Sequence, residues 1–266
     1  MPHPFIALLT LFIVLAVAAV APATADDELP DARDLINRYI EAVGGREALL
    51  NQTEATMTGS FEMAAMGLSA PLVVASRPPA DRVVRVEMPQ MGEIISGYTR
   101  DVAWSVDPFM GARLLDGAEL ASLKEQSEPG ALLRDEGYVA SVQTVERTTI
   151  GGEECFRVRI EWQSGREGFD CYAVDSGLLV GMETTQTTAM GEITSVSEIS
   201  DYQRFDDVLI PTRMEMSLMG QRQVLAIDSV EFGTPDPALF ELPPAIEALI
   251  EAEQAKEQAE EAVEES

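Results

Sequence analysis

Histidine and lysine are nearly missing from this chain of 266 residues. The only histidine is His3, and lysine occurs only at Lys124 and Lys256. The body of the chain therefore has no imidazole that could act as a base, activate a nucleophile or bind a metal. Gly-x-Ser-x-Gly, Ser-x-x-Lys, phosphate-binding glycine loops and calcium-binding aspartate loops are also absent. We expect a protein that is not an enzyme and holds no metal or cofactor.

Basic residues are scarce as well. The chain has 18 Lys and Arg against 46 Asp and Glu, which gives a formal net charge of −28. Neutralising the phosphates of a nucleic acid requires a basic surface, so nucleic acid is excluded as a partner. The same charge disfavours simple electrostatic docking on anionic lipid headgroups. It is typical of a solubilising acidic surface.

The one long hydrophobic run lies at the start of the chain. Residues from Phe5 to Val20 are almost all apolar, and Ala23-Thr24-Ala25 follows shortly after. An apolar core that ends in small residues at alternate positions is typical of a signal peptide, so we predict cleavage after Ala25 and export to the periplasm. The alternative is a membrane anchor, but the run is shorter than the roughly 20 residues that span a bilayer. No cysteine follows the run, which argues against a bacterial lipoprotein.

Composition divides the remaining chain into two parts. Residues 26–244 have the length and hydrophobic content of a single β-rich domain, which we expect to be a monomer. The acidic tail at 245–266 carries eight glutamates and a single Lys256 after Pro243-Pro244. So many like charges make a poor folding unit, and we predict a partly helical or disordered, solvated tail. A partner-binding role is the alternative.

Cysteine is limited to Cys155 and Cys171. An even pair in an exported chain predicts a structural disulfide. The spacing leaves the local geometry open. A directly opposed pair centres a hairpin on Gln163, whereas the turn signal Ser164-Gly165 would pair Cys155 with residue 174. Either one inference is wrong or the loop is wider than two residues.

Hydrophobic periodicity predicts one early helix followed by many strands. Residues 31–44 have helical spacing and end at Gly44-Gly45, and a short second turn covers 46–50. From residue 54 the period changes to two, and this alternation returns at 156–162 and 210–218. Strands with one apolar face form antiparallel sheets. We count roughly eleven or twelve strands, which predicts a mainly β fold with a large antiparallel curved sheet or barrel.

A predicted helix at 118–126 interrupts the strands, and such an insertion can cover one opening of a curved sheet. The alternative is an ordinary surface excursion. The dipeptide Met-Gly also recurs five times, at strand reversals or short connections. Glycine suits a turn, but methionine is explained better by packing against a ligand of irregular shape. The methionines are Met66, Met91, Met110, Met190 and Met219.

If these turns share one rim, their methionines would form an apolar mouth suited to acyl chains. The alternative is that each packs on its own hairpin. Four further residues complete the predicted cavity. Phe109 lies beside Met110, and Met214 and Met216 follow the apolar face of a strand. Trp104 lies in a short strand, where a tryptophan is more often part of the core than a platform for a ligand.

Several segments, taken in order, resemble bacterial outer-membrane lipoprotein-sorting proteins of the LolA-like superfamily. The resemblance runs from about Ala32 to Pro243. The segments are Tyr39–Leu49 (YIEAVGGREAL), Val102–Trp104 (VAW) through Gly111–Gly117 (GARLLDG), Asp175–Leu179 (DSGLL), Ala189–Ile193 (AMGEI), Asp201–Pro211 (DYQRFDDVLIP) and Phe240–Pro243 (FELP).

The resemblance implies an unclosed antiparallel β-barrel with a helical lid. It also implies a cavity that accepts lipid or lipoprotein acyl chains during transit across the periplasm. Proteins of this fold also act as envelope sensors or scaffolds that bind a membrane or regulatory protein, which is the alternative function. A carboxylate enzyme such as a glycosidase is a third possibility, and it would need two inward acids about 5–10 Å apart.

Overall fold

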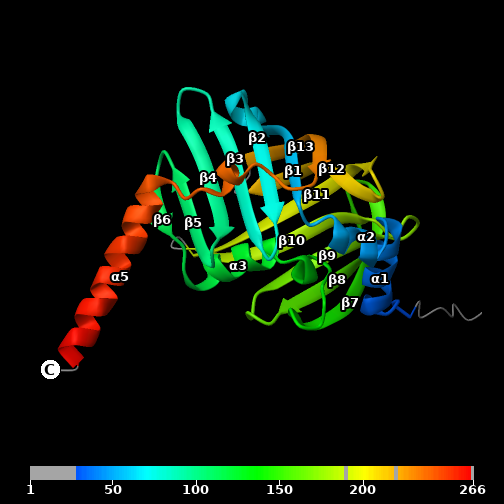
Figure 1. The fold of residues 1–266 in the computed structure, drawn as a ribbon. Helices are drawn as coiled ribbons and strands as arrows, with labels where there is room; N and C mark the ends of the chain where they lie inside the picture. Colours follow the sequence, from blue (N-terminus) through cyan, green and yellow to red (C-terminus); the bar gives the residue numbers. More distant parts are fainter. Residues whose placement is uncertain (1–27, 189–190, 219–220, 265–266) are drawn as a thin grey trace, which may run out of the picture.

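The computed structural model describes residues 28–188, 191–218 and 221–264. Its described strands form a single antiparallel sheet (Figure 1). The predicted signal peptide, Met190 and Met219 lie outside the described residues. The strands are β1 (Ala55–Met63), β2 (Leu68–Arg77), β3 (Asp81–Met88), β4 (Gly92–Thr99), β5 (Val102–Asp107), β6 (Gly111–Leu114), β7 (Val139–Ile150), β8 (Glu153–Trp162), β9 (Glu167–Ala173), β10 (Leu179–Thr188), β11 (Gly191–Phe205), β12 (Val208–Leu218) and β13 (Gln221–Phe232).

The sheet consists of two meanders that meet where β1 pairs with β13. Its order is β6-β5-β4-β3-β2-β1-β13-β12-β11-β10-β9-β8-β7, so β6 and β7 are edges and the sheet is not closed. The unclosed antiparallel sheet predicted from sequence is therefore confirmed. The expected eleven or twelve strands are an undercount of the thirteen observed. Short strands such as the four-residue β6 are too brief to show a period of two.

Helices occupy the beginning, the middle and the end of the chain. They are α1 (Ala32–Ala42), α2 (Arg46–Asn51), α3 (Gly117–Ser127), α4 (Pro129–Leu132) and α5 (Pro244–Glu264), with short 3₁₀ turns η1 (Ala64–Met66) and η2 (Pro237–Phe240). The Asp31 side chain caps α1 by accepting hydrogen bonds from the backbone N–H groups of Arg33 and Asp34 at 2.8 and 3.3 Å. Gly44 and Gly45 then take positive φ angles, which ends the helix as predicted.

The two faces of the sheet have different coverings. We call the face that contacts α1 and α4 the inner face. On it the alternating apolar residues of β8, including Val158, Ile160 and Trp162, form a core with Leu35 and Ile36 of α1. On the opposite, outer face, η2 and the start of α5 cross β2–β6 (Figure 1). The period of two in the sequence therefore separates two distinct cores.

Cys155 and Cys171 form a disulfide on the outer face of the β8–β9 hairpin. Cys155 lies opposite Ala173, and Cys171 lies opposite Arg157, so the cysteines are diagonal neighbours. The register centres the hairpin on Ser164, because Glu161 pairs with Glu167. Neither sequence-based centre is correct, and the loop is wider than two residues. A loop of that width lets the disulfide and the Ser164-Gly165 turn coexist.

The acidic tail is helical from Pro244 to Glu264, and its first turns are packed. Ile246 is fully buried in the outer core with Phe240, and Ile250 packs against the same cluster. From Glu251 to Glu260 every residue is exposed, and α5 projects away from the sheet (Figure 1). Among the described helices, none combines the length and the apolar character needed to cross a membrane.

Candidate functional site

The helix α3 spans the opening of the unclosed sheet. It follows edge strand β6 and contacts β4 and β5 on one side and β10 on the other. On the β6 side, Glu119 Oε2 lies 3.5 Å from Arg113 Nη1. On the other side, Glu125 accepts hydrogen bonds from Ser164 Oγ at 2.5 Å and from Arg166 Nε at 2.8 Å. Polar contacts therefore anchor both ends of α3 across the opening.

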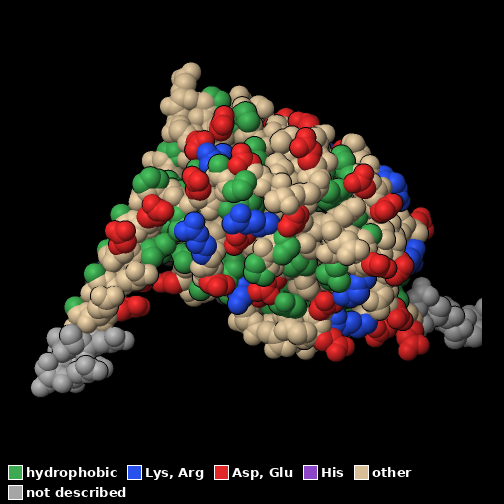
Figure 2. Space-filling model, viewed as in Figure 1, with side chains coloured by type: hydrophobic (Ala, Val, Ile, Leu, Met, Phe, Trp, Pro, Cys, Tyr) green, Lys and Arg blue, Asp and Glu red, His purple; other side chains and the backbone are tan. Residues whose placement is uncertain are grey.

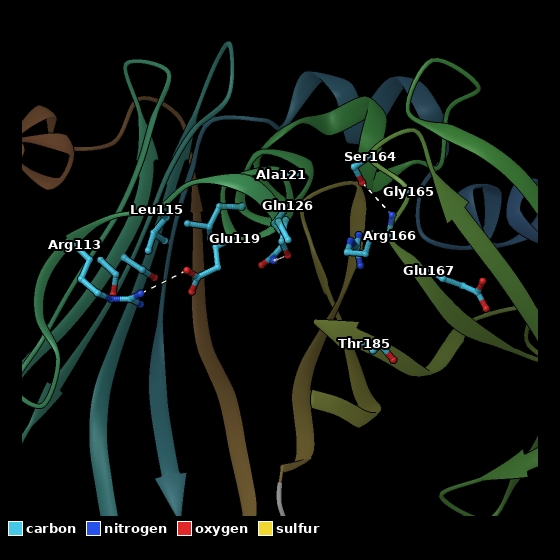
Figure 3. Close-up of a pocket in the computed structure, with 15 residues that line it drawn as sticks. Arg113, Leu115, Glu119, Ala121, Gln126, Ser164, Gly165, Arg166, Glu167 and Thr185 are labelled. Carbon is cyan, nitrogen blue, oxygen red and sulfur yellow. Dashed lines mark hydrogen bonds and ion pairs between the residues drawn. The ribbon is translucent and has the colours of Figure 1, made fainter. Parts of the chain in front are cut away.

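A cavity of about 530 Å³ lies along α3, and we call it cavity 1 (Figure 3). Its polar wall includes the hydroxyls of Ser96, Ser105 and Thr185 and the side chains of Arg113 and Glu119. The full lining is Ser96, Ser105, Arg113, Leu115, Ala118, Glu119, Ala121, Ser122, Leu123, Gln126, Ser164, Gly165, Arg166, Glu167 and Thr185. Its two carboxylates are both paired with arginine, Glu119 with Arg113 and Glu167 with Arg159.

A second cavity of about 230 Å³, cavity 2, adjoins the first at Gln126, which lines both. It lies between α1–α2, α4 and the ends of β1, β2, β3 and β12, and its walls are mainly apolar. The full lining is Tyr39, Val43, Leu49, Gln52, Thr53, Ala55, Met57, Ser76, Arg82, Gln126, Ser127, Pro129, Leu132, Leu133, Val208, Leu209, Ile210, Pro211 and Phe232. An apolar space with a few polar groups is typical of small-molecule sites.

A buried ion pair holds α4 against the inner face beside cavity 2. Arg134, just after α4, has a left-handed φ of 57° and donates from Nε to Asp170 Oδ2 at 2.9 Å. Tyr172 Oη donates to the same carboxylate oxygen at 3.0 Å. The carboxylate of Asp170 raises the pKa of Arg134, which opposes the lowering effect of burial. Burial raises the pKa of Tyr172 and of Tyr39. The cluster is charged, yet all of its members have partners.

Two other polar side chains near cavity 2, Tyr98 and Arg82, differ in whether they have a hydrogen-bond partner. Tyr98 donates from Oη to Asp101 at 3.0 Å, and burial together with that carboxylate raises its pKa to about 12. Arg82, opposite Tyr98 in the β3–β4 register, lines cavity 2 directly. Burial lowers the pKa of Arg82. Its guanidinium makes no hydrogen bond or ion pair with the residues that the structure describes.

The predicted methionine rim has a simple topological counterpart. Because neighbouring strands are antiparallel, the β1–β2, β3–β4 and β5–β6 connections all lie at the same ends of the strands. At these strand ends Met66, Phe109 and Met110 are largely exposed, with fractional exposures of 60%, 75% and 62%. Met91 instead packs against the apolar cluster of β1–β3.

The remaining predicted residues lie elsewhere. Trp104 is buried on the outer face, where its Nε1 donates to Thr99 Oγ1 at 2.9 Å and its ring packs over Gly97. Met214 packs against the inner core, and Met216 is partly buried on the same strand. None of the seven predicted cavity residues within the described ranges lines cavity 1 or cavity 2.

Sequence reasoning missed the cavity walls because small and polar residues form them. Ser96 and Ser105 alternate with apolar outer-face residues in β4 and β5, a pattern that usually indicates a solvent-exposed face. Arg82 was likewise indistinguishable from the surface arginines of the same strand. One feature of the sequence could have indicated the site, namely the helix predicted at 118–126. A helix that lies over a polar sheet face encloses space between them.

The visible face of the molecule carries more acidic than basic side chains. Figure 2 shows aspartate and glutamate side chains spread over the visible face, with fewer arginines between them. Among the described residues, no group of three or more His, Cys, Asp and Glu side chains is placed to hold a metal ion.

Known proteins resemble this chain in structure rather than in sequence. No family model matches the sequence, and no curated protein matches it. A LolA superfamily protein from Nitrosomonas europaea superimposes with a TM-score of 0.52 at 13% identity, covering 80% of this chain and 98% of that one. A domain described as an outer membrane lipoprotein-sorting protein, from Vibrio parahaemolyticus, has a TM-score of 0.52 at 12% identity, with coverage of 79% and 97%.

A DUF1329 family protein from Desulfovibrio piger is similar to the same extent, with a TM-score of 0.52, 10% identity and coverage of 79% and 97%. At such identities the likeness establishes the fold alone. The fold of this chain is an unclosed antiparallel sheet whose opening is covered by helices. It is the LolA-like fold, which confirms the fold that the sequence motifs predicted.

Proposed function

We propose that the protein is a non-catalytic lipid-binding module of the bacterial envelope that holds an acyl chain between α3 and the inner face of the sheet. The observation that carries the proposal is the pair of adjoining cavities beneath a helix anchored at both ends. Burying apolar area stabilises a complex by about 25 cal/mol per Å², so a single acyl chain would supply substantial affinity.

The compartment belongs to the same proposal. The apolar run before Ala25 supports export, and the Cys155–Cys171 disulfide suits an oxidising periplasm. The lipoprotein-sorting description of the Vibrio domain supports acyl chains as the ligand class. A carrier must also release its ligand, and the polar contacts that anchor α3 are easier to break than an apolar core.

Native mass spectrometry of protein purified from the periplasm tests the proposal, combined with extraction of whatever is bound. We expect co-purifying acyl lipid, and a rise in melting temperature when palmitate is added to stripped protein. Ala121→Trp places a large side chain in cavity 1 and should abolish that rise. Ala252→Trp, the same change on the exposed part of α5, is the matched control. An apo mass and an unchanged melt would contradict the proposal.

A second function, docking of a basic envelope protein, is favoured by α5. Its exposed part carries Glu251, Glu253, Glu257 and Glu260 and projects from the body. Truncation after Ile250 would keep the packed first turns and remove this part. Loss of a periplasmic partner from pull-downs with unchanged lipid binding would assign α5 to that role, and unchanged pull-downs would exclude it.

A further inference from the structure

Cavity 2 contains a cation, Arg82, that pairs with no group in the described residues. Its walls are contributed mainly by apolar side chains such as Leu49, Leu133, Ile210 and Phe232, and Arg82 enters from the middle of this set. No aspartate or glutamate is among its lining residues in the described part of the chain. Arg82 is only partly exposed, and a charge that loses part of its contact with water is normally paired.

The neighbouring arginines show what is unusual about Arg82. On the same strand, Arg85 points to the outer face and pairs with Glu93 at 2.9 Å. At the strand start, Arg77 pairs with Asp81 at 2.8 Å. Deeper in the inner core, Arg134 pairs with Asp170. Arg82 faces inward beside Ser76 and Tyr98, and the Tyr98 hydroxyl is already engaged by Asp101.

A second polar atom in cavity 2 also lacks a partner. The side-chain oxygen of Gln52 is buried and makes no hydrogen bond within the described residues. Rotating the amide by half a turn exchanges its oxygen and nitrogen and would present an N–H donor at the same place. Arg82 and Gln52 can therefore both donate into one apolar space, which is the donor set that a carboxylate or phosphate group requires.

We propose that Arg82, assisted by Gln52, binds the headgroup of the ligand, and that the preferred ligand is a single-chain amphiphile ending in a carboxylate or a phosphate. This inference rests on the proposed lipid-binding function. The headgroup would lie at Arg82 in cavity 2. The alkyl chain would pass Gln126 into cavity 1 and lie against its apolar lining residues, Leu115, Ala118, Ala121 and Leu123. Pairing an anion with a partly buried guanidinium gives a stronger hydrogen bond than pairing two neutral groups.

The net charge of the protein does not oppose this assignment. The charge of −28 is spread over a solvated surface, where salt screens its field beyond about 10 Å. Headgroup recognition would therefore depend on the local donors and not on attraction from a distance. High salt should consequently leave the affinity for an anionic amphiphile nearly unchanged, unlike binding to a basic surface.

Binding of three probes with the same alkyl chain tests the assignment. Palmitate carries a carboxylate, hexadecyl phosphate carries a phosphate, and hexadecanol is neutral. Each is titrated by displacement of a fluorescent lipid into the stripped full-length mature protein, below its micelle concentration. We expect the wild type to bind at least one anionic probe roughly tenfold or more tightly than hexadecanol. The anionic probe that binds more tightly identifies the preferred headgroup.

Arg82→Gln should remove the preference for the anionic probe and leave hexadecanol binding unchanged. Arg82→Lys should keep part of it, and Arg85→Gln on the outer face should keep all of it. Gln52→Leu should weaken it by a smaller factor. Because Arg82 pairs with no group in the part of the chain that the structure describes, Arg82→Gln should fold at least as stably as the wild type, which a thermal melt checks.

Two outcomes would overturn the assignment separately from the function. Equal affinity of the wild type for all three probes would leave an acyl-chain site without a headgroup pocket. An anionic preference that survives Arg82→Gln would place the headgroup elsewhere. Failure of all three probes to bind would overturn the proposed function together with the assignment.

Discussion

The inner face of the sheet has a filled half and a hollow half. In the filled half, formed by β7–β11 under α1 and α4, Trp162, Tyr172 and Ile160 are almost completely buried. In the hollow half, formed by β1–β6, Ser96 and Ser105 face cavity 1 and Arg82 faces cavity 2. The strands of both halves alternate in the same way. The covering helix makes the difference, because α1 is strongly amphipathic whereas α3 is mostly alanine and polar residues.

The residues that stabilise this fold and the space that can hold a ligand lie in different halves of the sheet. The core formed with α1 and the buried Arg134–Asp170 pair lie in the filled half, and the disulfide lies on the outer face of the same strands. The hollow half can then keep space and an uncompensated charge at a limited cost, because the other half stabilises the sheet to which both belong. Mutations should therefore affect stability in the filled half and binding in the hollow half.

The largest expected effect is that of Asp170→Ala in the filled half. It removes the partner of Arg134 and the acceptor of Tyr172, leaving a buried charge unpaired. We expect the free energy of unfolding to fall by about 3–5 kcal/mol in urea titrations. The control, Glu167→Ala, breaks the exposed pair with Arg159 and should cost less than about 1 kcal/mol. Similar losses in the two variants would mean that the buried Arg134–Asp170 pair stabilises the filled half no more than an exposed pair does.

The disulfide gives the next largest effect. Cys155→Ala combined with Cys171→Ala releases a loop with a sequence separation of 16, which should lower the free energy of unfolding by about 3 kcal/mol. Palmitate affinity, measured on the folded variant, should stay within about twofold of the wild type, because both cysteines lie on the outer face away from the cavities. A loss of binding that exceeds the loss of folded protein would show that the halves are coupled.

The secondary-structure elements could be predicted from the sequence more fully than the position of the disulfide. The α1 helix, the alternation of β1, β8 and β12 and the helix near 118–126 were predictable, because each rests on a local period or a turn signal. That the sheet is unclosed was implied only by the resemblance to the LolA-like superfamily. The placement of the cysteines was only partly predictable. Their diagonal relation depends on a hairpin register that the turn residues alone did not determine.

The candidate site was largely unpredictable, for a physical reason. Its walls come from β1–β6, α1–α4, the β8–β9 turn, β10, β12 and β13, and no local pattern predicts which of these segments meet. Methionine was a reasonable sign of a ligand-facing surface, but Met66 and Met110 lie exposed at the sheet edge. Arg82 became informative only when its lack of a partner was visible, and this is a property of three-dimensional structure.

Alkaline pH should lower the free energy of unfolding through buried tyrosines in both halves. Burial raises the pKa of Tyr172 in the filled half, and burial with Asp101 raises that of Tyr98 to about 12 near the hollow half. Because the folded protein favours the protonated phenol, this stabilisation is complete below pH 10 and is lost as pH rises toward the folded pKa. Each tyrosine should contribute a fall of about 1.4 kcal/mol per pH unit between pH 10 and 12.

Urea unfolding at several pH values measures that slope. Tyr172→Phe and Tyr98→Phe should each make it shallower by the same amount, although Tyr172→Phe should also lower stability at neutral pH through the lost hydrogen bond to Asp170. An unchanged slope in either variant would mean that the corresponding phenol ionises freely in the folded protein.

The smallest effect on global stability, and the sharpest test of the boundary between the halves, is expected for Glu125→Gln. This residue holds α3 to Arg166 and Ser164 at the filled side of cavity 1, with side-chain exposures of 11% for Glu125 and 17% for Arg166. Glutamine keeps the size and part of the hydrogen bonding, so the free energy of unfolding should fall by only about 1 kcal/mol. Losing the charge should nevertheless let α3 open more often, because no apolar core holds it there.

Hydrogen exchange should therefore accelerate in α3 while α1 stays protected, and palmitate should associate faster. Glu119→Gln, at the weaker 3.5 Å contact with Arg113, should change both rates less. Equal acceleration in α1 and α3 would mean that the two coverings open as one unit, and the filled and hollow halves would then be a single cooperative structure.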